Sequence, residues 1–181
     1  KRAVEIRLLD PMIKRMDPTR PILRAGDESI DMADIHAYEG VWEKTMHDFR
    51  ARVENLKKIR PDKPLLCTEY METGSNDSGV WYDLNRAKMH LGPNPTPDEM
   101  LLKHAELAAE QTEILRSNQF DGIFPYWYAD WVNLHSWSKH AEDTIYPRKK
   151  TTYYALKNAL SPLAVMLDIQ TTQFTSGGKI S

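Results

Sequence analysis

The residue best placed for chemistry in this sequence is a glutamate at the end of a short apolar run. The run KPLLCTE ends at Glu69 and has the pattern of a buried parallel strand whose last residue carries a carboxylate. Two other predicted strands end in His36-Ala37-Tyr38 and in Tyr126-Trp127. In a parallel β/α barrel such ends meet at one edge, so these side chains would share a site. A carboxylate there can attack an anomeric carbon and form an ester that water later hydrolyses; the alternative is an ion pair with a neighbouring Arg or Lys.

Metal and cofactor chemistry find no support in the sequence. It has six histidines, of which only His36 falls at a predicted strand end, and it has no HxH, HExxH or CxxC spacing. It also lacks the GxSxG, Walker and GxGxxG motifs. We therefore predict no metal and no cofactor.

The elements that would position these side chains alternate between helix and strand. Helical periodicity appears in residues 4–16, with a new start predicted at Pro11, and again in residues 42–60, 96–118 and 150–160. Apolar stretches that favour strands are residues 21–25, 30–38, 63–69 and 121–127. Residues 73–97 are rich in Gly, Asn, Asp and Pro, and we predict a long loop over the site. This alternation predicts an α/β fold of parallel β/α units.

The composition of the chain disfavours nucleic acid and a membrane as partners and is compatible with a carbohydrate. The 24 basic and 26 acidic residues are scattered, which disfavours nucleic acid, and no run approaches the ~18 apolar residues of a membrane span. The single cysteine, Cys67, allows no internal disulfide, so cysteine usage leaves the compartment open. Five Trp and eight Tyr supply aromatic faces that can line a sugar cleft, although most aromatic residues in a protein belong to its core.

Five pieces of the chain, in order, carry a family resemblance. They are DPTRPILRAG, DMADIHAYEGVW, KPLLCTEYMETGSN, DGIFPYWYADW and PRKKTTYYALKNALSP. Together they resemble the second half of the catalytic barrel of the β-galactosidase/β-glucuronidase family, glycoside hydrolase family two. The resemblance implies the C-terminal half of a (β/α)8 TIM-type barrel, about strands five to eight, over residues 1–161. Residues 162–181 alternate like a strand, and we expect them to start a following β-sandwich domain.

The resemblance also assigns roles to individual residues. Glu69 matches the nucleophile, and Tyr38 matches the tyrosine that hydrogen-bonds it. Trp127 matches the tryptophan that forms the floor of the first sugar subsite. His36 stands where the family often has Asn and is a candidate for contact with a sugar hydroxyl. Weaker candidates for the cleft wall are Trp42, Asp130 and Trp131, and each of the six residues other than Glu69 has a purely structural alternative.

The second carboxyl of a retaining hydrolase is not apparent in the sequence. In the family it is the Glu of an Asn-Glu pair after the fourth strand, and no Asn-Glu dipeptide occurs here. Glu39 and Glu72 lie near site strands but each comes after its strand end. We therefore expect the acid/base, with the N-terminal half of the barrel, on sequence upstream of Lys1.

The sequence thus predicts a retaining glycosidase that acts on a β-linked oligo- or polysaccharide. The alternative is a catalytically inactive carbohydrate-binding relative of the same barrel. Degradation of polysaccharides would favour a secreted or periplasmic location. The sequence does not select the sugar.

Overall fold

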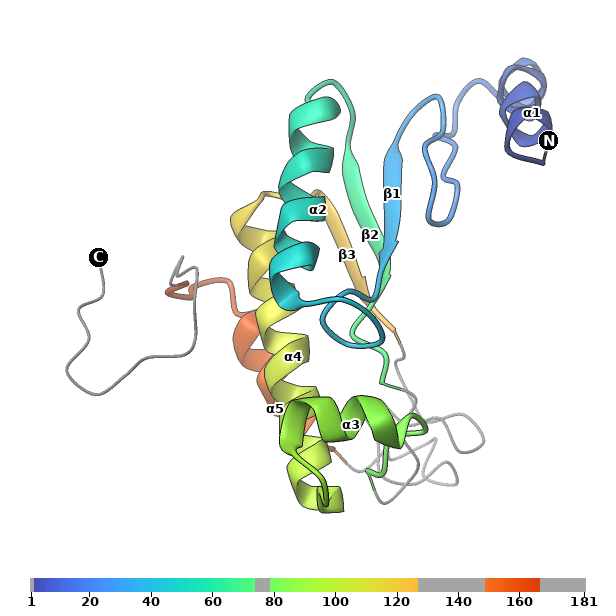
Figure 1. Cartoon of the computed structure of the whole chain (residues 1–181). Coiled ribbons are helices and arrows are strands. Elements are labelled where there is room, and N and C mark those ends of the chain that lie inside the picture. The colour runs from blue at the N-terminus through green and yellow to red at the C-terminus, as the bar shows by residue number, and fades with distance from the viewer. Residues whose placement is uncertain (1, 74–78, 127–148, 167–181) are drawn as a thin grey trace.

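The computed structural model describes residues 2–73, 79–126 and 149–166, with side chains described from residue 8 onward. Helices and strands alternate along the chain except for the consecutive helices α3 and α4 (Figure 1). They are α1 (Arg2–Met16), β1 (Ala33–Ala37), α2 (Met46–Ile59), β2 (Leu65–Tyr70), α3 (Leu84–Leu91), α4 (Pro97–Ser117), β3 (Gly122–Pro125) and α5 (Thr151–Ala159).

The three described strands form one parallel sheet in the order β1-β2-β3. This arrangement confirms the predicted α/β class. The strand predicted at residues 21–25 is not formed; the amide of Ile22 within it, and that of Gly26 directly after it, donate to side chains. The amide of Ile22 donates to Asp31 at 2.7 Å and the amide of Gly26 donates to Asp34 at 2.6 Å. Pro21 has no amide proton to offer a ladder.

Two helices start at the residues that their capping sequences indicate. The Thr45 side chain and Asp48 form a reciprocal capping box at the start of α2. Thr96 and Glu99 do the same at the start of α4, with Pro97 as the first helical residue. The helix predicted to begin at Thr96 and end near residue 118 is therefore confirmed. None of the helices in the described ranges is long and apolar enough to cross a bilayer.

Two helical predictions need correction. Helix α1 runs through Pro11 without a break. Its neighbour Asp10 is anchored from outside the helix, by the amide of Ile30 at 2.8 Å and by Arg24 at 2.7 Å, and a proline removes only one hydrogen bond of the helix ladder. The second correction concerns residues 73–97, which contain the helix α3. The Asp83 side chain accepts hydrogen bonds from the amides of Asn85 and Arg86, the second and third residues of the helix, and so caps it.

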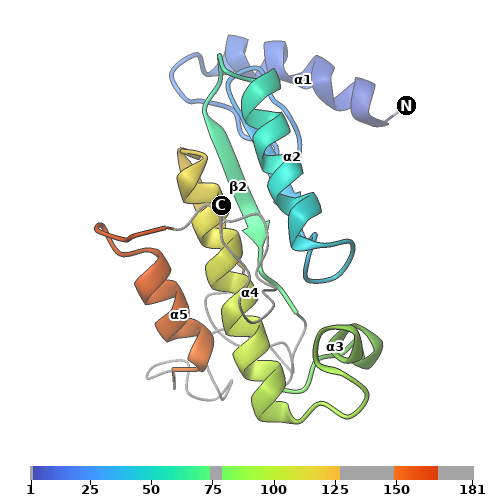
Figure 2. The ribbon, with the colours of Figure 1, turned by 60° about the vertical axis from the view of Figure 1, so that its left-hand side comes forward.

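The main apolar core lies between one face of the sheet and the helices α2, α4 and α5 (Figures 1 and 2). Strand residues alternate in direction, so every second residue of β1 enters this core. The buried members of the core are Ile35, Ala37, Phe49, Val53, Cys67, Tyr70, Met71, Ala108, Ile114, Leu115 and Leu156. The opposite face of the sheet carries the polar candidates for chemistry.

A buried histidine on α4 ties the end of β2 to α5. The Nε2 of His104 lies 2.8 Å from the carbonyl oxygen of Met71, and its Nδ1 lies 3.4 Å from the hydroxyl of Thr152. This pairing fits a neutral ring that donates from Nε2 and accepts at Nδ1. Burial lowers the pKa of His104 from 6.5 to about 4, against the opposing effect of its hydrogen bond to Met71.

We expect His104 to make the fold sensitive to acid. Between pH 6.5 and about 4 the unfolded chain protonates this ring while the folded chain does not, so the stability falls as the pH falls. The loss should approach about 3 kcal/mol at pH 4, since each pKa unit corresponds to about 1.4 kcal/mol. Urea unfolding at pH 7, 5 and 4 measures it. His104→Gln should flatten this pH dependence, and the exposed His47→Gln should leave it unchanged; equal curves for the two variants would contradict the assignment.

Candidate active site

The side chain of Glu69 reaches the polar face of the sheet because of a β-bulge. Simple alternation along β2 would send Glu69 to the same face as Cys67, which is fully buried in the core. The pairing register with β1 shifts, however, so that Ile35 pairs with Cys67 and His36 pairs with Glu69. Thr68 is the extra residue, and both Thr68 and Glu69 then face Tyr38 and its strand neighbours. Bulges re-aim side chains in this way beside many active sites.

One oxygen of the Glu69 carboxylate is held by two donors. They are His36 in β1 and Tyr38, the residue directly after β1. The Tyr38 hydroxyl donates a hydrogen bond to Oε2 of Glu69. The Nδ1 of His36 lies 3.1 Å from the same oxygen. About a quarter of each of the Glu69 and His36 side chains remains exposed, at 27% and 28%. The carboxylate is therefore fixed in direction but still open to a ligand.

The tyrosines around Glu69 stay protonated and can act as donors. Burial raises the pKa of Tyr38 well above its usual value, and the hydrogen bond to Glu69 and the charge of this residue add to the effect. Burial also raises the pKa of Tyr126, and the negative charges of Glu69 and Glu72 raise it further. Tyr126 comes directly after β3, and its amide donates to the carbonyl oxygen of Tyr70 at 3.3 Å. The ends of all three strands thus contribute to one site.

Two polar side chains and one glycine that the sequence analysis did not single out lie beside His36. Thr68 lies 3.2 Å from Nε2 of His36 and donates to Asp34 at 2.5 Å. Asp34 is buried and also accepts the amides of Thr68 and Gly26. A signal for Asp34 was present in the sequence, because Asp34, His36 and Tyr38 stand at alternate positions and so share one face of a strand. Nothing in the sequence marks Thr68 or Gly26.

The other predicted cleft residues have mixed outcomes. Trp42 follows the turn after Tyr38, and its amide donates to the carbonyl oxygen of Tyr38 at 2.9 Å. Its side chain is 37% exposed, and among the described residues no hydrogen bond or ring contact joins the indole to Glu69 or to Tyr38. Its role in the cleft stays a prediction. Trp127, Asp130 and Trp131 lie outside the described residues.

The two carboxylates that could be mistaken for an acid/base occupy different surroundings. Glu39 is only 2% exposed, and its Oε1 lies 2.8 Å from Arg52 and 3.7 Å from Lys44. This ion pair binds the segment after β1 to α2. Glu72 is also buried and lies close enough to Tyr38 and Tyr126 for its charge to raise their pKa values. Within the described ranges no three His, Cys, Asp or Glu side chains are grouped so as to hold a metal ion.

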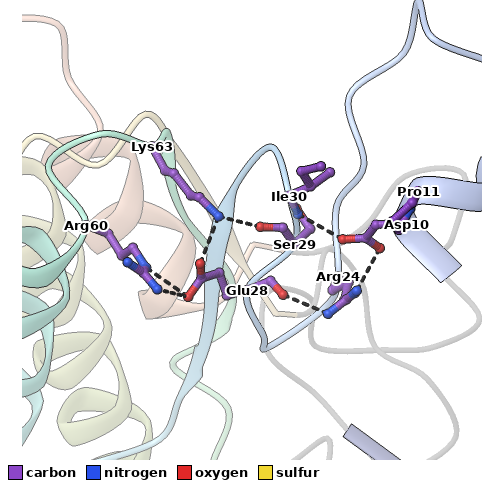
Figure 3. A pocket seen from close by; sticks show the side chains of 8 residues that line it. All are labelled: Asp10, Pro11, Arg24, Glu28, Ser29, Ile30, Arg60 and Lys63. Atoms are coloured by element: carbon purple, nitrogen blue, oxygen red, sulfur yellow. Dashed lines mark hydrogen bonds and ion pairs between the residues drawn. The ribbon is translucent and has the colours of Figure 1, made fainter. Parts of the chain in front are cut away.

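A separate cavity of about 290 Å³ is lined by residues of α1 and by residues that precede β1 and β2, among them Ser29 and Lys63 (Figure 3). Its charged lining residues pair with one another. Glu28 accepts from Arg60 at 2.6 Å and from Lys63 at 2.8 Å, and Arg24 lies 2.7 Å from Asp10. In a β/α barrel the amino end of the strands serves stability and the carboxyl end carries chemistry. We therefore interpret the ion pairs around this cavity as structural contacts that join α1 to the segments before the sheet strands.

A parallel β/α sheet with a donor-held carboxylate at the carboxyl ends of its strands is typical of enzymes built on β/α units. Comparison with models of protein families then gives the family. Residues 1–158 match the family described as glycosyl hydrolases family 2, TIM barrel domain, and the chain belongs to this family. Membership indicates glycoside hydrolase activity, as the sequence resemblance implied. A search of curated proteins finds no match.

Proposed function

We propose that the chain carries the nucleophile of a retaining glycoside hydrolase acting on a β-linked carbohydrate, and that this nucleophile is Glu69. The observation that carries the proposal is the pair of donors, Tyr38 and His36, on Oε2 of Glu69. Both hydrogen bonds hold the carboxylate in one orientation. Both donors engage Oε2, and Oε1 is the oxygen that attacks.

The reaction would proceed by two displacements. Oε1 of Glu69 forms a bond to the anomeric carbon as the bond from this carbon to the leaving oxygen breaks. Water then attacks the same carbon, and the carboxylate of Glu69 departs. In the intermediate, Oε2 becomes the carbonyl oxygen of an ester, and Tyr38 and His36 can still donate to it. When the ester breaks, the same donors stabilise the charge that returns to the carboxylate.

A second carboxyl must protonate the leaving oxygen and later activate water, at about 5–5.5 Å from the nucleophile. Glu39 is unsuited, because it is buried in an ion pair with Arg52. We propose that this group is the glutamate of an Asn-Glu pair after the fourth barrel strand, on sequence upstream of Lys1, as the family resemblance implies. By the same resemblance, residues 1–161 would form the second half of the barrel and residues 162–181 would begin a β-sandwich domain.

The sugar-binding part of the proposal rests on aromatic and polar residues of the same edge. Trp127 would form the floor of the first subsite by meeting the apolar face of a pyranose ring, as in the family resemblance. Trp42, Asp130 and Trp131 would line the cleft. Tyr126, whose hydroxyl is a protonated donor, is an added candidate for contact with a sugar hydroxyl. The bound partner would be an oligo- or polysaccharide.

A covalent label tests the proposal directly. An activated 2-fluoro β-glycoside has a leaving group that needs no proton, and its fluorine slows hydrolysis of the ester, so the intermediate should accumulate. Digestion and mass spectrometry should place one glycosyl group on the peptide that contains Glu69. A label on another residue would overturn the assignment. Binding of the saccharide with no label on any residue would favour the inactive carbohydrate-binding relative instead.

A further inference from the structure

His36 has a specific partner at each ring nitrogen. On one side, Nδ1 lies 3.1 Å from Oε2 of Glu69. On the other side, Nε2 lies 3.2 Å from Oγ1 of Thr68 and 3.8 Å from the carboxylate of Asp34. The ring therefore connects the carboxylate of Glu69 with a second, more deeply buried carboxylate.

The positions of the protons between Glu69, His36, Thr68 and Asp34 follow from which atoms can donate and which can only accept. A carboxylate can only accept, so the Nδ1 that faces Glu69 carries a proton. The hydroxyl of Thr68 has one proton, and this proton is donated to Asp34 at 2.5 Å. The oxygen of Thr68 can then only accept from His36, which makes Nε2 a donor as well. Both nitrogens of the ring are donors in this arrangement.

Backbone amides hold the carboxylate of Asp34, the last member of this series of hydrogen bonds. Asp34 accepts the amide of Thr68 on Oδ1 at 2.9 Å and the amide of Gly26 on Oδ2 at 2.6 Å. Gly26 has a φ of +70°, and a Cβ at this position would lie 3.1–3.4 Å from atoms of the His36 ring. The glycine therefore forms a close wall against the ring. Asp34 and Thr68 fix one edge of the ring and Gly26 limits the space beside it.

We propose that Asp34, acting through Thr68, is a positioning residue that holds the His36 ring with Nδ1–H directed at Oε2 of Glu69. The inference rests on the proposed function of Glu69 and adds the residues that orient its second donor. The sequence Asp34-Ile35-His36-Ala37-Tyr38 places the orienting carboxylate and both donors on one face of β1 and the residue after it. The bulge in β2 supplies Thr68 as the connection between them.

This arrangement has a chemical consequence for both displacements. The ring holds its Nδ1–H toward Oε2 of Glu69 and so fixes the direction of the nucleophile before attack. The same ring faces the returning negative charge when the ester breaks. Because the ring is already oriented, this stabilisation requires no rearrangement during the reaction.

Substitution of Thr68 separates positioning from packing. Thr68→Val keeps the shape of the side chain but removes the hydroxyl, and it should lower kcat for an activated aryl β-glycoside about tenfold, with KM little changed. Thr68→Ser keeps the hydroxyl and should retain most of the activity. Asp34→Asn should resemble Thr68→Val. Equal losses in the Val and Ser variants would show a packing effect and overturn the inference, as would a Val variant with unchanged kcat.

A spectroscopic readout tests the inference without reference to activity. Long-range ¹H–¹⁵N spectra of the labelled chain should show both His36 nitrogens protonated, with the signals assigned by their loss in His36→Asn. In Thr68→Val, Nε2 should lose its slowly exchanging proton while Nδ1 keeps its own, and Thr68→Ser should restore the original pattern. An unprotonated Nδ1 in the unmodified chain would overturn the inference even if Glu69 is labelled. Failure of the 2-fluoro glycoside to label Glu69, with the spectra as expected, would instead reject the proposed function.

Discussion

Replacement of Glu69 by glutamine is expected to lower the turnover of an activated aryl β-glycoside by about 10⁴-fold or more, since the attacking group itself is removed. The amide has nearly the shape of the carboxylate, so the donors Tyr38 and His36 keep a neighbour of the same size. The amide is a much weaker nucleophile and cannot form the ester. Release of the phenol, followed by absorbance under conditions of excess substrate, measures the effect.

Two further variants make the Glu69 result specific. Glu43→Gln removes an equal charge from the exposed segment after β1 and should retain the original turnover. Glu69→Ala leaves space for a small anion, so added azide should restore release of the phenol. Its glycosyl azide product should have the opposite anomeric configuration to the substrate, because azide attacks once and directly. Unchanged turnover in Glu69→Gln, or an azide product of retained configuration, would contradict the role of Glu69 as nucleophile.

Removal of the Tyr38 hydroxyl is the second large effect that we expect. Tyr38→Phe deletes one donor to Oε2 of Glu69 and leaves His36 as the other. The loss of a single preorganised donor to a developing charge typically costs about 10²–10³-fold in kcat, and we expect a value near 10²-fold because His36 remains. The value of KM should change little, since the phenol is expected to act on the nucleophile and not on the bound sugar.

The pH dependence of this variant provides a separate check. Burial and the neighbouring Glu69 raise the pKa of Tyr38, so the phenol stays protonated at alkaline pH and should set neither limb of the pH–rate profile. Tyr38→Phe should therefore lower kcat without shifting the alkaline limb of the profile. Tyr154→Phe, an exposed phenol on α5, is the matched control and should have the original kcat. A lost alkaline limb in Tyr38→Phe would contradict the role of this tyrosine as a permanently protonated donor.

The local elements were largely predictable because their signals are local. The apolar run before Glu69 predicted β2, and the helical periodicity of residues 96–118 predicted α4. Failures occurred where a distant partner decides the outcome. Residues 21–25 have a strand-like pattern, yet Asp31 takes the amide of Ile22, and Asp34 takes the amide of Gly26 directly after the stretch. The helix α3 within residues 73–97 depends on a short capped segment in a stretch dominated by turn-forming residues.

In the candidate site, too, some features could be predicted from local sequence and others depend on distant partners. From the sequence alone, Glu69, Tyr38 and His36 could be placed near the ends of two neighbouring strands, because parallel strands present their carboxyl ends at one edge. The sequence could not give the face on which each side chain lies. Alternation along β2 would have put Glu69 in the core beside Cys67, and only the bulge at Thr68 turns it toward Tyr38.

The sequence by itself determined the family, the α/β class and the identity of the candidate nucleophile, because residue types, their order and their short-range spacing are properties of the chain. The tertiary structure decided which oxygen of Glu69 is held, and it joined Asp34, Thr68 and Gly26 to His36. These contacts join residues that are 8 to 34 positions apart in the chain. Their geometry depends on a one-residue shift of strand register, which is set by the packing of the whole sheet against its helices and has no mark in the local sequence.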